Sequence, residues 1–225
     1  MSKAIQEIRE HKFKDPGSAI THFIAMILAM IASVPLLMKA HSSGDGTLTT
    51  VALTVFMGSM ILLYGASTTY HMLDISPKVN KVLRKLDHMM IYVLIAGTYT
   101  PICLVVLGDF AGWKLLGVVW AVAVLGMIMN LCWITCPKWL SSVLYTALGW
   151  LCIFALSRIL RALPEKGVLW FFTGGIIYTA GAIIYALKLP VFNRLHKNFG
   201  SHEIFHLFVM AGSFCHYMLM ITCVA

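Results

Sequence analysis

Seven long apolar segments run through this chain of 225 residues, and they limit what it can fold into. A helix that crosses a membrane needs about 20 mostly apolar residues, and each segment is close to that length. The segments do not alternate apolar and polar residues, as the strands of a transmembrane barrel would. We therefore predict an all-α membrane protein, a bundle of seven transmembrane helices at about Ala19–Met38, Leu48–His71, Leu86–Val106, Trp113–Ile134, Leu140–Leu160, Val168–Leu187 and Ser201–Val224.

The composition agrees with this fold class and leaves little room for a separate soluble domain. The chain is 60% hydrophobic and 12% charged, whereas soluble domains are about 25% charged. We predict a polar N-terminal segment at residues 1–17 and a single transmembrane domain at residues 18–225. The net charge of +8 comes from Lys and Arg in short loops. Such a distribution suits lipid head groups and does not favour nucleic acid as a partner.

The basic residues also predict the orientation. When the spans alternate in direction, most Lys and Arg fall on the same side as the N-terminus, and that side is the cytoplasmic one by the positive-inside rule. The N-terminus is then cytoplasmic and the C-terminus external. Residues 1–17 mix both charge signs and do not resemble a cleaved signal peptide. We expect a multi-pass protein of the cell (plasma) membrane whose partners are membrane lipids, and homo-oligomerisation stays open.

Ionisable residues in distant segments share one predicted depth, at the cytoplasmic end of the bundle. They are His22 in the first span, His71 at the end of the second, Asp87 at the start of the third, and His202 and His206 at the start of the seventh. Ionisable residues are costly within a membrane, so they mark candidate functional sites. Their common depth indicates that they form one site.

The chemistry best suited to these residues is metal binding. His202 and His206 are four residues apart, so a helix places both imidazoles on one face, where they can bind one metal ion. His71 would complete a set of three ligands and leave a fourth position for water, as in catalytic zinc sites. Asp87 would contact that water or act as its base, and Ser67, one turn before His71, could bind a substrate carbonyl. Imidazole ligands favour zinc over iron or manganese.

Simpler interpretations exist for each residue alone. A single His71 would ordinarily be a packed interior residue, and Asp87 at a helix N-terminus could serve only the helix dipole. His22, His88 and Glu203 are candidates for residues that contact the metal ligands without binding the metal themselves. His216 lies about 21 Å along the last helix from His202 and belongs to a different layer.

The stretch His202-Glu-Ile-Phe-His206 also matches the H-E-x-x-H pattern of zinc proteases, in which the Glu is a general base. A membrane metalloprotease is therefore an alternative. That class draws a further ligand from a later acidic residue, and no Asp or Glu follows Glu203 in this sequence.

Three motifs together resemble the bacterial hemolysin III family of the progestin and adipoQ receptor superfamily. They are Ser67-x-x-x-His71, Leu86-Asp87-His88 leading to Pro101, and Ser201-His202-Glu-Ile-Phe-His206. The resemblance implies seven helices, zinc held by His71, His202 and His206, Asp87 near the zinc water, and Ser67 in support. It also implies hydrolysis of a lipid amide, a membrane-lysing activity, or a role in membrane-lipid homeostasis. His88 replaces the Tyr found in adiponectin receptors, so the resemblance does not imply a substrate of the receptor type.

Three functions remain open from the sequence. The first is a zinc-dependent hydrolase of a lipid amide or ester, with Asp87 and Ser67 as catalytic residues. The second is a non-enzymatic, receptor-like membrane regulator in which zinc is structural. The third is a cytolytic protein, although the sequence has no amphipathic lytic segment.

Overall fold

The structure is a computed structural model that describes residues 14–42, 46–133, 135–187 and 200–225. Most of the predicted segment 1–17 and nearly all of the basic loop before Ser201 lie outside these residues. Within them, there are helices and no strand. Seven helical segments of the described chain are long and apolar enough to cross a membrane, at Pro16–Ser42 (α2), Gly46–Met72 (α3), Pro77–Leu107 (α4 and η1), Phe110–Cys132 (α5), Trp139–Ala162 (within α6, η2 and α7), Glu165–Leu187 (α8) and Ser201–Cys223 (α10). The predicted fold class is confirmed.

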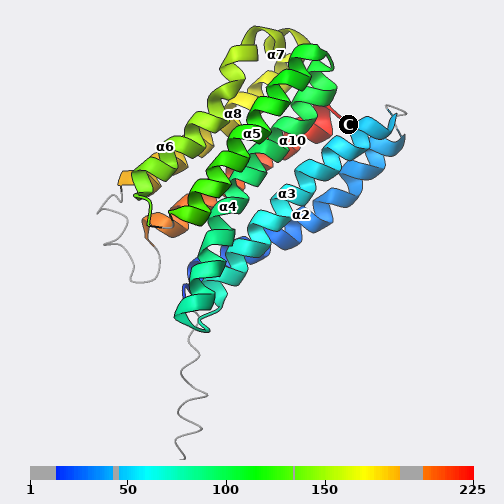
Figure 1. Cartoon of the computed structure of the whole chain (residues 1–225). Coiled ribbons are helices and arrows are strands. Elements are labelled where there is room, and N and C mark those ends of the chain that lie inside the picture. Colours follow the sequence, from blue (N-terminus) through cyan, green and yellow to red (C-terminus); the bar gives the residue numbers. More distant parts are fainter. Residues whose placement is uncertain (1–13, 43–45, 134, 188–199) are drawn as a thin grey trace, which may run out of the picture.

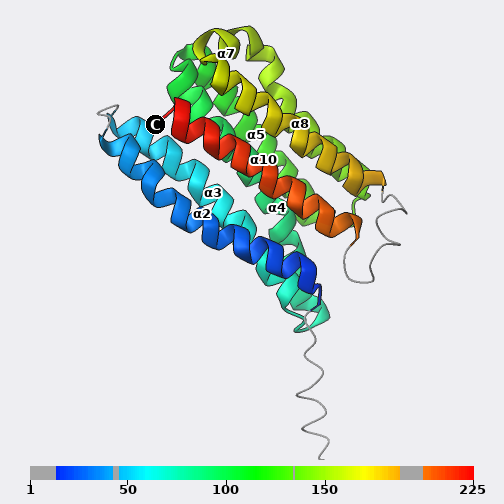
Figure 2. The ribbon, with the colours of Figure 1, turned by 180° about the vertical axis from the view of Figure 1, so that it is seen from behind.

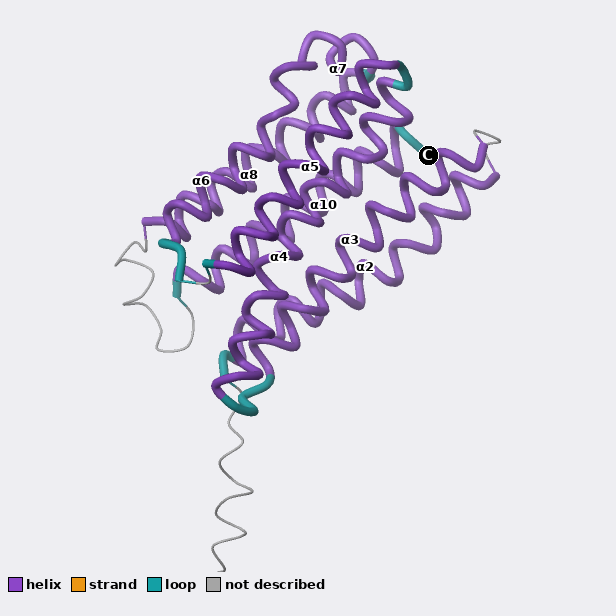
Figure 3. Tube along the Cα trace, viewed as in Figure 1, coloured by secondary structure: helices purple, strands orange, loops and turns teal. Residues whose placement is uncertain are grey.

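The helices run up and down the bundle, and the connections that the structure describes in full, such as those before α4 and α5, are short (Figure 3). Helices α2 and α3 lie side by side at one edge, and α8 and α10 are neighbours in the views from both sides (Figures 1 and 2). Helix α10 also packs against α2. The start of α2 and the end of α10 lie at opposite ends of the bundle (Figure 1). Which end faces the cytoplasm stays a prediction.

Glycines allow α8 to pack closely against α10. A Cβ at Gly174 would lie 2.8 Å from Nε2 of His216, and one at Gly181 would lie 2.7 Å from Cβ of Phe208. Small residues are the usual means by which membrane helices approach one another, because the lipid supplies no hydrophobic drive for their association. This close approach fixes the position of α10, which carries two of the predicted metal ligands.

The predicted start of the third span was wrong. The span was predicted to begin at about Leu86, but helix α4 (Pro77–Pro101) begins at Pro77. The Ser76 hydroxyl accepts a hydrogen bond of 3.3 Å from the backbone N–H of Val79, and Pro77 occupies the first turn. Both are helix-starting signals. Basic residues between Pro77 and Leu86 interrupt the apolar run, but the helix continues through them. Asp87 therefore lies two to three turns inside α4.

Two spans change helix type within their length. After Pro101, α4 continues as a π-helical segment, η1 (Ile102–Leu107). Gly108, with φ of 61°, then reverses the chain into α5. The fifth span consists of α6 (Lys138–Gly149), the 3-10 segment η2 (Trp150–Ala155) and α7 (Leu156–Ala162). The break at η2 is where Tyr99 of α4 reaches across to accept a 2.8 Å bond from the N–H of Cys152.

Large apolar side chains cover much of the outer surface. Ile31 on α2 is 63% exposed and Phe154 in the fifth span is 83% exposed. Exposed apolar residues on helices of this length are expected where the surrounding medium is lipid. The polar side chains described below are turned inward instead.

Candidate metal centre

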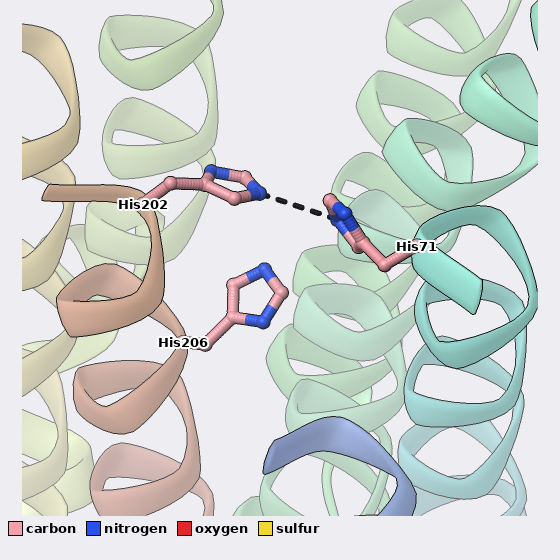
Figure 4. A group of neighbouring side chains, drawn as sticks. All are labelled: His71, His202 and His206. Carbon is pink, nitrogen blue, oxygen red and sulfur yellow. Dashed lines mark hydrogen bonds between the residues drawn. The ribbon is translucent and has the colours of Figure 1, made fainter. Parts of the chain in front are cut away.

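Three imidazoles meet where the end of α3 faces the start of α10. His71 comes from α3 and His202 and His206 from α10, and the rings point toward one another (Figure 4). One ring nitrogen from each lies within 4.8 Å of those of the other two. His71 and His206 are each 2% exposed, and His202 is half-buried. The structure thus brings together the three residues predicted as ligands.

The distance between two of these rings fits a shared ion. Nε2 of His202 lies 3.2 Å from Nε2 of His71. Two nitrogens bound to one tetrahedral zinc ion at about 2.0–2.1 Å are roughly 3.3 Å apart. The set contains only imidazoles, and neutral imidazole is a common zinc ligand. All three nitrogens lie within 4.8 Å of one another, so these residues could hold a zinc ion.

An aspartate that the sequence interpretation missed orients His71. The Asp15 Oδ2 atom lies 3.0 Å from Nδ1 of His71, and the Asp15 backbone N–H donates a 3.0 Å bond to the His71 carbonyl. Because a carboxylate can only accept, His71 donates through Nδ1–H. Its Nε2 lone pair is then directed at His202 and His206. A carboxylate behind a ligating histidine is the usual arrangement in metal sites.

His206 is oriented differently, by a stacked ring. The His22 imidazole from α2 lies parallel to that of His206, with centroids 3.7 Å apart and 7° between the planes. Neither ring nitrogen of His22, nor Nδ1 of His206, has a hydrogen-bond partner among the described residues. The flat contact with His22 thus helps to hold the His206 ring.

Asp87 and Ser67 lie on the wall of a cavity beside the imidazoles. This cavity has a volume of about 160 Å³ and is also lined by His22, His202 and His206. Asp87 is 7% exposed, and its Oδ2 atom lies 3.3 Å from Nδ1 of His88. The Ser67 hydroxyl is enclosed and has no partner within the described chain. Both residues share the space next to the histidines, while their catalytic roles stay predictions.

Glu203 serves the helix instead of the imidazoles. Its Oε2 atom accepts a 2.7 Å bond from the N–H of Gly200, just before α10, and its Oε1 atom accepts a 2.9 Å bond from the Ser18 hydroxyl. Oε2 of Glu203 thus caps α10, and Oε1 connects α10 to α2. This geometry does not favour the protease interpretation, which requires the glutamate as a base at the metal.

A sequence comparison identifies the family. A profile described as haemolysin-III related matches residues 11–217. The chain belongs to this family. Hemolysin-3 of Bacillus cereus is 37% identical to this haemolysin-III protein over 213 residues, which cover 95% of this chain and 91% of that protein. The Hemolysin-3 homolog of Bacillus subtilis (strain 168) is 37% identical over 197 residues, 88% of each chain.

A more distant relative supports the wider superfamily. The Adiponectin receptor protein of Drosophila melanogaster is 28% identical over 183 residues, which cover 72% of this chain but 40% of the receptor. The family predicted from the three motifs is confirmed. The haemolysin-III protein is thus a multi-pass membrane protein.

Replacing Asp15 should weaken metal binding. We expect Asp15→Ala to lower the zinc affinity of the purified haemolysin-III protein by about 10- to 100-fold, the usual loss for a partner of a ligating histidine. Competition with a fluorescent chelator measures this affinity. The control is Glu165→Ala, which removes another exposed carboxylate at the far end of the bundle. Equal affinity in both variants would show that Asp15 does not support the site.

Replacing His22 separates stacking from hydrogen bonding. His22→Phe keeps a flat ring against His206, and we expect its zinc affinity to stay close to that of the unmodified protein. His22→Ala should bind zinc more weakly by roughly two- to tenfold, the value of an aromatic contact. Chelator competition on both variants checks this. A loss in His22→Phe as large as in His22→Ala would mean that the His22 nitrogens matter instead.

Proposed function

We propose that this haemolysin-III protein is a zinc-dependent hydrolase that cleaves a lipid amide or ester within the plasma membrane and so adjusts membrane-lipid composition. The observation that carries the proposal is the group of three imidazoles beside a cavity that also contains a carboxylate and an unpaired hydroxyl. Three histidine ligands leave a coordination position open, which is typical of catalytic and not of structural zinc sites.

Each residue has a role in this chemistry. His71, His202 and His206 would hold the ion, and zinc in such a site supplies a Lewis acid and an activated water. Asp87 takes the proton of the attacking water and passes it to the leaving amine or alkoxide. Nδ1 of His88 lies 3.3 Å from Oδ2 of Asp87, so Oδ1 is the oxygen assigned to that proton. The Ser67 hydroxyl donates a hydrogen bond to the substrate carbonyl oxygen.

The cavity supports a lipid as the substrate. Its walls are mainly apolar, with aromatic side chains such as Phe171, Phe172 and Phe205. An acyl chain fits such a lining. Its transfer from water into an apolar cavity lowers the free energy, and so do the packing contacts that it makes there. Asp87 and Ser67 line the same cavity as His202 and His206, and a carbonyl would react beside these residues. The cytoplasmic position of this end follows from the charge distribution and is part of the proposal.

The experiment is turnover by the purified protein in lipid nanodiscs. We expect zinc-loaded protein to release free fatty acid from at least one member of a panel of lipid amides and esters, measured by mass spectrometry. Asp87→Asn should retain zinc and lose about 100-fold or more in rate, the contribution of a general base. Absence of product from the entire panel, or unchanged turnover in Asp87→Asn, would contradict the proposal.

A second candidate follows from the names of the relatives. Two of them are called Hemolysin-3 or its homolog, which suggests lysis of membranes. The same nanodisc preparation, transferred to dye-filled liposomes, tests this function directly. Dye release without any lipid product would favour a cytolytic protein. Zinc-dependent stability with neither product nor leakage would favour a membrane regulator in which zinc is structural.

A further inference from the structure

The cavity beside the imidazoles extends well beyond them along α10. Its lining includes His202, Val209 and His216, which are spaced seven residues apart and therefore share one face of the helix. At 1.5 Å per residue, His216 lies about 15 Å along the helix from His206. The cavity thus has histidines near both ends, with apolar walls between them.

The packing around His216 leaves room for its ring and fixes its plane. Tyr178 of α8 stacks on it, with centroids 5.5 Å apart and 18° between the planes, and Phe171 meets it edge-on at 6.1 Å. On the same helix, Gly174 lies so close that a Cβ would come within 2.8 Å of Nε2 of His216. Helix α8 therefore carries a glycine where any side chain would push the imidazole aside.

The neighbouring hydroxyls do not satisfy His216. The Tyr64 hydroxyl donates a 2.7 Å bond to Ser213, and the Tyr178 hydroxyl shares a 2.8 Å bond with the same Ser213 oxygen. His216 is 6% exposed, and its Nδ1 atom has no hydrogen-bond partner among the described residues. The imidazole is buried and lines the cavity, and its Nδ1 atom forms no hydrogen bond with a neighbouring side chain.

A purely structural role explains this arrangement poorly. Buried polar groups in folded proteins almost always have a partner, and leaving one unpaired costs free energy that an apolar ring of the same shape would avoid. Phenylalanine would pack between Tyr178 and Phe171 without that cost. A polar ring at this position gains a function if the group that occupies the cavity can form a hydrogen bond with it.

We propose that His216 forms a second polar subsite in the cavity, which binds a hydroxyl or carbonyl group carried partway along the chain of a lipid ligand. This rests on the proposed function only in taking the ligand to be a lipid. The subsite gives selectivity: a plain acyl chain leaves His216 unpaired, whereas a chain with an oxygen at the matching distance pairs with it. Selectivity of this kind arises because the unpaired buried group penalises the wrong ligand.

The test compares binding of stearamide with that of stearamides hydroxylated at successive positions along the chain. Displacement of a fluorescent fatty amide from protein in nanodiscs measures binding without turnover. We expect the unmodified protein to prefer one hydroxyl position over plain stearamide by roughly two- to tenfold. His216→Phe should bind plain stearamide at least as well and lose the preference, and His216→Gln, which can still form a hydrogen bond, should keep part of it.

Controls separate this subsite from other effects. His41→Phe makes the same exchange at an exposed position of α2 and should keep the preference. If His216→Phe does not fold, His216→Leu gives the same comparison.

An unmodified protein with no preferred position, or a His216→Phe variant that keeps the preference, overturns the subsite. Failure to bind any amide overturns the lipid assignment and the subsite together. An intact preference without any hydrolysis overturns only the hydrolase and leaves the subsite standing.

Discussion

The contact between the end of α3 and the start of α10 is the constraint on which the site depends. Imidazoles, a carboxylate and a hydroxyl are gathered there among helices that are otherwise apolar. Polar groups inside a membrane protein are costly unless they are paired or bind something. His71 and His202 approach to 3.2 Å between their Nε2 atoms. The proposed zinc ion would account for this approach and for the convergence of three imidazoles from two helices.

The surrounding residues hold the two helices in this position. Asp15 fixes His71 from the start of α2, and Ser18, one turn later, bonds to Glu203 at the start of α10. His22, one further turn along α2, stacks on His206. Helix α2 therefore contacts both sides of the histidine group through three consecutive turns. It positions the ligands without supplying one.

The sequence predicted which histidines converge better than it predicted the residues that support them. His71, His202 and His206 could be found because spans of known direction place them at one depth, and that depth follows from counting helices. The role of Asp15 could not be found in this way, because it precedes the first span and its carboxylate looks like one more charge in a polar segment.

Glu203 was misleading, because its spacing matches a protease motif while its carboxylate caps α10 and bonds to Ser18. The start of α4 was missed because charged residues end an apolar run without ending a helix. Ring stacking of His22 on His206 depends on side-chain packing, which no spacing rule gives.

Metal analysis of the purified protein tests the central claim most directly. Protein isolated without added metal, and washed free of loosely bound ions, is measured by mass spectrometry for transition metals. The proposed site predicts about one zinc ion per chain, and its loss in His71→Ala and in His202→Ala. His216→Ala, which removes a histidine from the far end of the same cavity, should keep the zinc. A protein that contains no transition metal, or one whose metal content is unchanged when His71 or His202 is replaced, would contradict the account.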